Sequence, residues 1–169
     1  ARMTGRPAAT LLHLGPGLGN GIANLHNARR AGTPIVNIVG DHATTHAKYD
    51  APLQSDIDAL ASNVSKWVRS SPTSAAVAGD AAEGVAASLS APRGTSTLVL
   101  PADVSWSEGA VPAPPVEPAP LATVAQETID AIAIALQSDT RSGLLIGDRV
   151  LLARLLVRHR CLLPEHDER

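Results

Sequence analysis

The chain has 169 residues, enough for one domain and part of a second when domains contain roughly 100–200 residues. Its net charge of −2 argues against a nucleic-acid partner, because nucleic-acid-binding proteins carry a basic surface. Aromatic residues make up 2% of the chain and Phe is absent, so the core must consist of Ala, Val, Leu and Ile. This composition favours a tightly packed α/β domain over an aromatic-rich all-β domain.

The cysteine content and the hydropathy of the chain indicate the cellular compartment in which we expect the protein. Cys161 is the single cysteine, which excludes an internal disulfide and a cysteine-type metal site and favours a reducing, cytoplasmic compartment. No apolar run approaches the ~18 residues needed to cross a membrane. Residues 1–7 do not have the pattern of a signal peptide and are typical of a helix end, with Gly5 as C-cap and Pro7 after it. Since the chain does not begin with Met, we expect further residues upstream.

Two apolar runs joined by one helical pattern follow. Residues 8–14 are predicted to form a strand and residues 15–21, which include four glycines, a turn. Asn20 is the expected N-cap of a helix over 20–30. A second strand is predicted at 35–39. A strand, helix and strand in this order form a βαβ unit, so the sheet should be parallel.

Parallel sheets bind ligands outside the carboxyl ends of their strands. We therefore expect a site where residues 15–21 and 40–46 meet, lined by both segments in a shared hollow. The helix that follows the glycines should point its free N–H groups at this site.

Three histidines lie near this predicted site. His13, inside the first strand, fits a buried core histidine or a site residue near the strand end. His42 and His46 are four residues apart and follow Asp41. They fit a pocket-lining loop, a plain surface loop or, with no third ligand evident, a metal site. We predict no metal ligands in the chain.

The rest of the first predicted domain, residues 1–106, alternates helix and strand. We expect a short helix capped by Ser55, a short strand with one polar face at 64–69, a long helix over 74–89 and a strand at 96–100. Val77, Ala81 and Val85 should form the buried stripe of the long helix. Trp106 is expected to pack on the domain edge as a lid.

A proline-rich linker at 107–121 should separate this domain from the next. An amphipathic helix is predicted at 123–137, a buried strand at 143–147 and another helix at 149–160. One strand and two helices are too few to bury a core. Residues 122–169 therefore look like the beginning of a second α/β domain, truncated or diverged.

Three segments carry a family resemblance. They are residues 1–7 with the following strand and Gly15-Pro16-Gly17-x-x-Asn20, the strand at 93–104 with its Pro-x-Asp-Val ending, and the linker, helix and strand up to residue 147. In this order they resemble the amino-terminal pyrimidine-binding domain and the start of the central domain of thiamine-diphosphate-dependent enzymes. Among these enzymes the acetolactate synthase large subunit is the most similar. The resemblance covers about residues 1–148.

The resemblance implies a three-layer, parallel-sheet domain that lacks its first elements. It implies decarboxylation of a 2-keto acid and transfer of the two-carbon unit to a second carbonyl, as in branched-chain amino acid biosynthesis. It places Gly15, Pro16, Gly17 and Asn20 at the aminopyrimidine end of thiamine diphosphate. It also places Asp41 and His42 in the substrate pocket, where the synthases usually carry glutamine in place of Asp41. This departure points to a different acceptor or pocket polarity.

The resemblance also implies parts that this chain does not supply. The cofactor lies between the pyrimidine domain of one subunit and the diphosphate domain of another, so a second subunit of the same protein is the expected partner. Mg²⁺ belongs to that diphosphate domain, and FAD is a possible cofactor of the central domain. The activating glutamate is expected upstream of residue 1, so the catalytic residues remain unassigned. We therefore expect a fragment of an enzyme that is inactive alone.

A dinucleotide-binding domain is one alternative. Gly15-x-Gly17 opens a helix after a strand, and Asp41 ends the next strand where a ribose-binding acid belongs. Against it, Asn20 stands at the third glycine position and Pro16 removes an amide from the phosphate cradle.

A non-catalytic paralogue is the other alternative. It would act as a scaffold or regulatory partner of a true synthase, and the Asp41-His42 departure fits it as well as it fits altered specificity.

Overall fold

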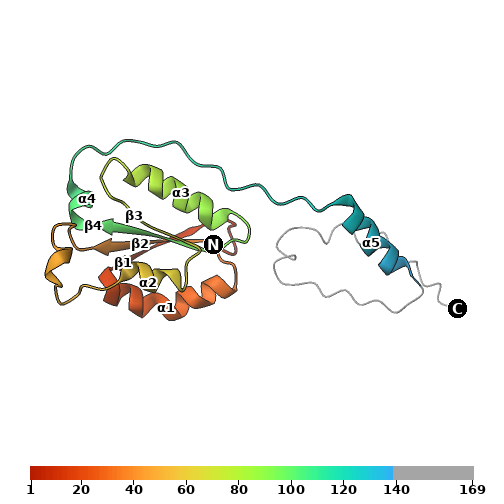
Figure 1. The fold of residues 1–169 in the computed structure, drawn as a ribbon, viewed down its shortest axis with the longest axis horizontal. Helices are drawn as coiled ribbons and strands as arrows, with labels where there is room; N and C mark the ends of the chain where they lie inside the picture. Colours follow the sequence, from red (N-terminus) through yellow and green to blue (C-terminus); the bar gives the residue numbers. More distant parts are fainter. Residues whose placement is uncertain (139–169) are drawn as a thin grey trace. The chain divides into compact units, whose positions relative to one another are not determined.

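The computed structural model describes residues 1–138, and the chain divides into two compact units, Ala1–Leu121 and Ala122–Arg169. The first unit contains a four-stranded sheet whose pairings are all parallel (Figure 1). Its strands are β1 (Ala8–His13), β2 (Ile35–Asp41), β3 (Trp67–Ser70) and β4 (Thr95–Pro101), in the order β1-β2-β4-β3. The predicted parallel α/β fold is confirmed.

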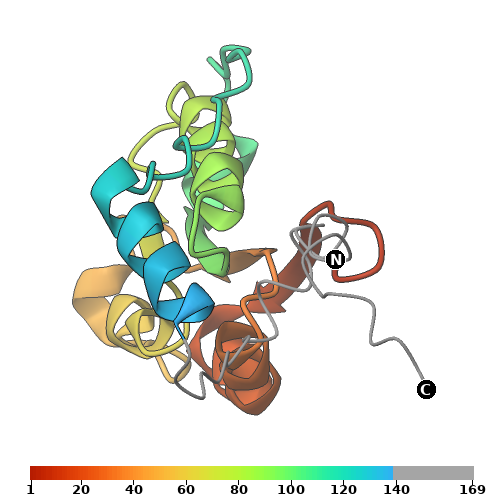
Figure 2. The same cartoon turned by 90° about the vertical axis from the view of Figure 1, so that its right-hand side faces the viewer.

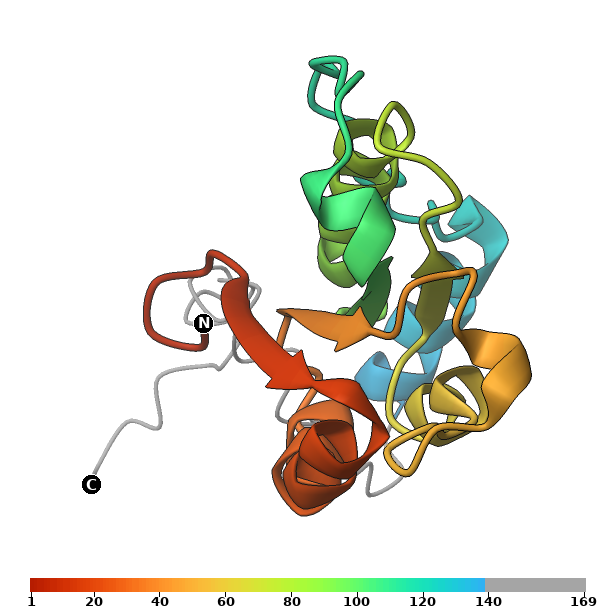
Figure 3. The same cartoon turned by 90° about the vertical axis from the view of Figure 1, so that its left-hand side faces the viewer.

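Helices cover both faces of this sheet (Figures 2 and 3). The helices of the first unit are α1 (Leu14–Arg30), the 3₁₀ helix η1 (Ala47–Tyr49), α2 (Ile57–Ser62), α3 (Val77–Leu89) and α4 (Ala102–Trp106). α1 and α2 pack on one face and α3 on the other, which produces three layers. Strand β1 connects to β2 through α1, as the βαβ pattern predicted.

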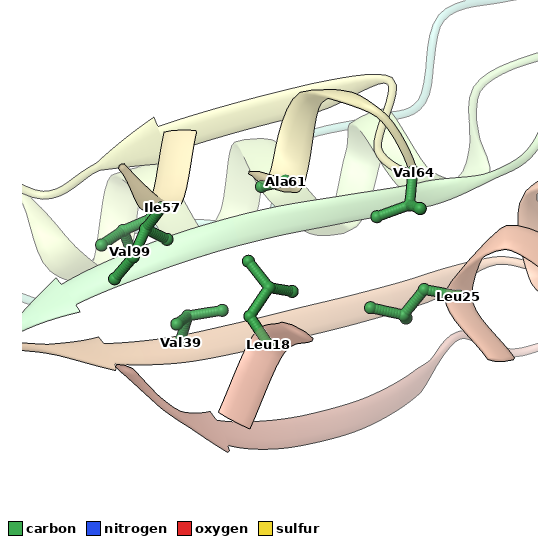
Figure 4. Packing of buried hydrophobic residues seen from close by; sticks show 7 residues of the cluster. All are labelled: Leu18, Leu25, Val39, Ile57, Ala61, Val64 and Val99. Carbon is green, nitrogen blue, oxygen red and sulfur yellow. The ribbon is translucent and has the colours of Figure 1, made fainter. Parts of the chain in front are cut away.

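The apolar core lies between the sheet and the α1/α2 layer (Figure 4). Its buried members are Leu18, Leu25, Val39, Ile57, Ala61, Val64 and Val99. Leu18 and Leu25 are seven residues apart, so they lie on the same face of α1. Burying a side chain of this size contributes about 1.5–3 kcal/mol, so α1 is fixed to the sheet mainly by these leucines.

A row of polar side chains crosses the same face of the sheet. The Thr10 hydroxyl donates to Asn37 Oδ1 at 2.8 Å, and Asn37 Nδ2 donates to Thr97 Oγ1 at 3.2 Å. Thr97 Oγ1 also lies 2.7 Å from the Ser65 hydroxyl. The fully buried amide of Asn37 is therefore paired on both sides, which offsets the cost of burying it.

The predicted buried stripe of α3, from Val77 to Val85, is wrong. Val85 is 38% exposed, and the buried residues of this helix are Asp80, Gly84, Ala86 and Ser88. The reason is that α3 packs on polar and bulky residues of β3. A Cβ at Gly84 would lie 3.1 Å from the Trp67 ring, and Asp80 accepts hydrogen bonds from Arg69 of β3 and from Ser71, the residue after it.

Two element boundaries also differ from prediction. The third strand along the chain begins at Trp67 instead of Val64, which belongs to the core. Helix α2 is capped by Asp56, whose Oδ1 accepts from the Ala59 amide at 2.9 Å, and not by Ser55. Both Asp and Ser are favourable N-caps, so composition alone did not separate them.

The outward face of β1 is exposed among the described residues. Leu11 is 77% exposed, and His13 on the same face is also exposed. The interpretation of His13 as a core histidine is therefore wrong. Trp106 is 74% exposed, so the predicted packing of this residue on the domain edge is wrong too.

In the second unit the structure describes helix α5 (Gln126–Gln137), close to the predicted helix at 123–137. The predicted strand at 143–147 and helix at 149–160 lie outside the described residues. Within residues 1–138, none of the helices combines the length and the apolar composition that crossing a bilayer requires.

Candidate functional site at the carboxyl edge of the sheet

The parallel register brings the carboxyl ends of neighbouring strands together. His13 at the end of β1 pairs with Gly40 of β2, and Asp41 pairs with Pro101 of β4. The segments that follow β1 and β2 therefore start at the same edge of the sheet, as predicted. The structure of each segment differs from the prediction.

The predicted glycine turn is wrong, because α1 begins at Leu14 directly after β1. His13 is the N-cap residue, and Leu14 has a φ of 57°, a left-handed conformation that is uncommon for a residue with a Cβ. Pro16 fits the first helical turn, where its missing N–H would have no intrahelical acceptor. Asn20 therefore lies inside the helix with an exposed side chain and does not cap it.

The glycines of this segment have different surroundings. Gly15 is buried, and a Cβ there would overlap the side chain of Ser55. A Cβ at Gly17 would make ordinary contacts, 3.6 Å from His13 Cβ, and one at Gly19 would meet open space. Gly15 is thus required for packing, whereas Gly17 is half-buried beside His13 and would tolerate a Cβ.

The exit of β2 carries Asp41 and His42. Asp41 Oδ1 accepts a hydrogen bond from the His42 amide at 2.7 Å. The His42 ring stacks on His46 with centroids 6.0 Å apart, and His46 meets the edge of Tyr49 at 5.7 Å. His42 Nε2 is shielded from solvent and has no hydrogen-bond partner among residues 1–138. No group of three potential metal ligands occurs in that part of the chain.

A hollow of about 170 Å³ opens at this edge on the α1/α2 side. It is lined by Asp41, Ser55, Asp56, Ile57, Asp58, Ser70 and Val99. Asp41 is therefore in a hollow, but none of Gly15, Pro16, Gly17 and Asn20 lines it. This hollow is therefore not shared by the two segments, because the glycines belong to helix α1 and Ser55, just before α2, lies against Gly15.

Sequence reasoning missed Ser55 and Ser70. Ser55 was assigned as a helix cap, although it fills the space that Gly15 leaves and lines the hollow. Ser70 ends β3, and the position of a residue at the end of a strand in a parallel sheet was the signal that could have indicated it.

Asp103 was also missed as part of this edge. Thr44, in the loop after β2, donates its amide to Asp103 Oδ1 at 3.0 Å and its hydroxyl to Asp103 Oδ2 at 2.5 Å. The Thr44 hydroxyl and amide lower the pKa of Asp103 below its usual value, because both bonds favour the carboxylate. The pairing of Asp41 with Pro101 could have indicated that the residues after them meet.

The sequence matches one family model. Residues 1–62 match the family described as thiamine pyrophosphate enzyme, N-terminal TPP binding domain. The chain is 57% identical over 147 residues to a protein of Mycobacterium tuberculosis H37Rv whose proposed name is acetolactate synthase large subunit IlvX. That alignment covers 87% of this chain and 28% of the relative.

Two solved structures are similar in fold. One is the thiamine diphosphate-dependent 4-hydroxybenzoylformate decarboxylase of Rhodococcus jostii RHA1, with a TM-score of 0.67, 22% identity, and coverage of 79% of this chain and 26% of the other. The second, from Mycobacterium smegmatis, is proposed to be a thiamin diphosphate-dependent enzyme. It has the same TM-score of 0.67 and 25% identity, and covers 82% and 27%. The chain thus spans about a quarter of the length of these proteins.

Proposed function

We propose that the chain is part of an acetolactate synthase-like enzyme of the thiamine pyrophosphate enzyme family, whose N-terminal domain model matches residues 1–62. The proposed reaction is the decarboxylation of a 2-keto acid and the transfer of the two-carbon unit to a second carbonyl. The observation that carries this proposal is the 57% identity over 147 residues to the mycobacterial relative. Since the chain covers 28% of that relative, the activity belongs to a longer protein or an assembly.

The aminopyrimidine end of thiamine diphosphate would lie against the first two turns of α1. The exposed side chains of Pro16 and Asn20 support this placement, since they present one apolar ring and one amide beside the half-buried Gly17. Gly15 has an indirect role: because it lacks a Cβ, the Ser55 side chain packs against it, and this contact fixes the start of α1. When bound, thiamine diphosphate supplies the electron sink that decarboxylation needs.

Asp41 and His42 would lie in the substrate pocket, on the side of the acceptor carbonyl. Asp41 lies in a hollow that also contains Asp56 and Asp58, and this acidic lining disfavours a second anion. An acceptor without a carboxylate therefore fits this edge better than a second 2-keto acid. A second subunit and a domain outside this chain would hold the diphosphate and Mg²⁺, and FAD would belong to the central domain.

Saturation-transfer NMR with thiamine diphosphate tests the cofactor placement. Irradiating the protein should transfer more magnetisation to the pyrimidine protons than to the thiazolium protons, because this chain is proposed to contact the pyrimidine end alone. NAD and FAD serve as comparison ligands. Stronger transfer to the thiazolium ring, or a stronger response to NAD, would contradict the proposal, and the NAD result would favour a dinucleotide-binding domain.

Two asparagines of α1 provide a matched pair of variants. We expect Asn20→Ala to reduce the pyrimidine signal several-fold, because the amide is proposed to contact the ring. Asn24→Ala removes the same exposed amide one turn further along the helix and should leave the signal unchanged. Equal effects of the two variants would place the cofactor elsewhere.

Turnover provides a separate check. The isolated chain, given pyruvate, thiamine diphosphate and Mg²⁺, should release no carbon dioxide, because the diphosphate domain is proposed to lie outside it. Measurable release of carbon dioxide would show that this chain alone suffices for decarboxylation, which would contradict the proposal that a domain outside it is required.

A non-catalytic partner of a true synthase is the second candidate, since Asp41 in place of the glutamine usual in the synthases fits it as well as it fits altered specificity. The residue that follows the upstream helix in the parent gene distinguishes the two candidates. A glutamate there favours the enzyme, and any other residue favours the scaffold.

A further inference from the structure

One carboxylate ties the loop after β2 to helix α4. Thr44 uses both of its donors on Asp103, the amide on Oδ1 at 3.0 Å and the hydroxyl on Oδ2 at 2.5 Å. The two residues are 59 positions apart in sequence, so the contact joins two separate segments that leave the same sheet edge. Because two bonds engage two different oxygens, they fix the direction of the loop as well as its distance from α4.

The anchor itself is held by the framework. Helix α4 continues directly from β4, and its Val104 is only 6% exposed. The Ser74 hydroxyl, just before α3, donates to the Val104 carbonyl at 2.8 Å. Asp103 is therefore presented from a segment whose backbone is packed and hydrogen-bonded, although its own side chain is accessible.

The loop has few other attachments. Within residues 42–46, the His46 amide donates to the Ala43 carbonyl at 2.7 Å, and the His42 amide donates to Asp41 at 2.7 Å. Both bonds are local. The Tyr49 amide of the adjacent η1 donates to the His46 carbonyl at 3.0 Å, also locally. Among the hydrogen bonds of the described residues, the pair from Thr44 is what joins this loop to an element distant in sequence.

We propose that Asp103 is a positioning residue, which fixes loop 42–46 and so orients Asp41 and His42 at the carboxyl edge of the sheet. The value of this orientation for catalysis rests on the proposed function. The tether, by which we mean the two hydrogen bonds from Thr44 to Asp103, does not depend on that function. Like an ordinary aspartate, Asp103 carries a charged carboxylate at neutral pH, and a charged acceptor makes stronger bonds than a neutral one.

Proteolysis with a lysine-specific protease measures the tether. Lys48 and Lys66 are the two lysines of the chain. Lys48 lies in η1, directly after the loop, whereas Lys66 precedes β3 and its ammonium group donates to the carbonyls of Ser90 and Pro92. Cleavage at Lys48 therefore reports local opening of the loop, and cleavage at Lys66 reports loss of the sheet.

In the full 169-residue chain, Asp103→Asn should raise the cleavage rate at Lys48 roughly fivefold and leave the rate at Lys66 unchanged. An amide keeps the size of the side chain but offers one acceptor oxygen and no charge. Equal increases at the two lysines, or no increase at Lys48, would overturn the proposal.

Thr44 tests the same tether from the other side. Thr44→Val removes the hydroxyl and should also accelerate cleavage at Lys48, whereas Thr44→Ser keeps both donors and should restore the wild-type rate. A spectroscopic signature accompanies these rates, since the Thr44 amide proton should move upfield in Asp103→Asn. Failure of Thr44→Ser to restore the rate would overturn the pairing.

The two proposals fail separately. If Asp103→Asn opens the loop while Asn20→Ala leaves the thiamine diphosphate signal unchanged, the tether stands and the proposed function does not. If the cofactor signal behaves as expected and cleavage at Lys48 is the same in Asp103→Asn, the positioning role of Asp103 is overturned alone.

Discussion

Two neighbouring strands leave the sheet at the same edge in different ways. β1 passes directly into α1, and the first residues of that helix, Leu14 and Gly15, are buried. β2 passes into residues 42–56 before α2 begins, and most of these residues are exposed. The first exit is held by packing and the second by a few hydrogen bonds. One half of the candidate site therefore depends on the core, and the other half on polar contacts with one carboxylate.

This difference matches the two proposed roles of the edge. A cofactor that stays bound through many turnovers requires a surface of constant shape, which a packed helix start provides. A substrate must enter and leave, which a loop with few attachments permits. Under the proposed function, the α1 side would hold thiamine diphosphate and the loop side would adapt to the substrate.

The largest expected effect comes from the core beneath the packed exit. Leu18→Ala should lower the free energy of unfolding by about 2–5 kcal/mol, because Leu18 is fully buried against the sheet and truncation leaves a cavity. Leu11→Ala is the matched control, since Leu11 is 77% exposed and its truncation should change stability by about 0.5 kcal/mol or less. Urea unfolding followed by circular dichroism measures both. Similar losses would show that α1 is not fixed by this packing.

The next effect concerns the glycine that admits Ser55. Gly15→Ala should destabilise the chain by about 1–3 kcal/mol, because the new methyl group overlaps the Ser55 side chain and α1 or α2 must shift. Gly19→Ala lies in the same helix, but its Cβ meets open space, so it should stabilise the chain by up to about 1 kcal/mol. If both substitutions stabilise the chain, Gly15 is not required for packing at this exit.

The parallel sheet could be predicted from sequence because its signals are local. The apolar runs at residues 8–14 and 35–39 and the helix between them specify a βαβ unit whatever the rest of the chain does. Strand ends were placed within one or two residues at β1 and β2. The short strand near residue 67 was placed less well, because Val64 and Val68 both contact the core and obscure its start.

The start of α1 could not be predicted, because four glycines suggested a turn. Helix propensity is weak evidence against tertiary packing, and here the burial of Leu14 and Leu18 fixes the backbone. The role of Asp103 could not be predicted from the sequence for another reason. Its partner, Thr44, is 59 residues away, and only the register of β2 against β4 brings them together.

The smallest expected effect lies at the tethered exit and concerns proton binding. The Thr44 hydroxyl and amide hold the pKa of Asp103 below its usual value, so the bonds contribute stability above the unfolded-state pKa and lose it as pH falls through the lower, folded-state pKa. The side chain is accessible to solvent, so we expect a local effect and no large change in global stability.

Carbon-13 NMR of the Asp103 carboxyl group measures this midpoint directly. An ordinary aspartate has its midpoint at about pH 4, and in the wild-type chain the midpoint of Asp103 should lie below that. In Thr44→Val the midpoint should rise toward the ordinary value, because the hydroxyl bond is the largest cause of the shift. Thr44→Ser should keep the wild-type midpoint. An unchanged midpoint in Thr44→Val would mean that the hydroxyl does not bind the carboxylate in solution, and that the loop after β2 is held to α4 by the backbone amide alone.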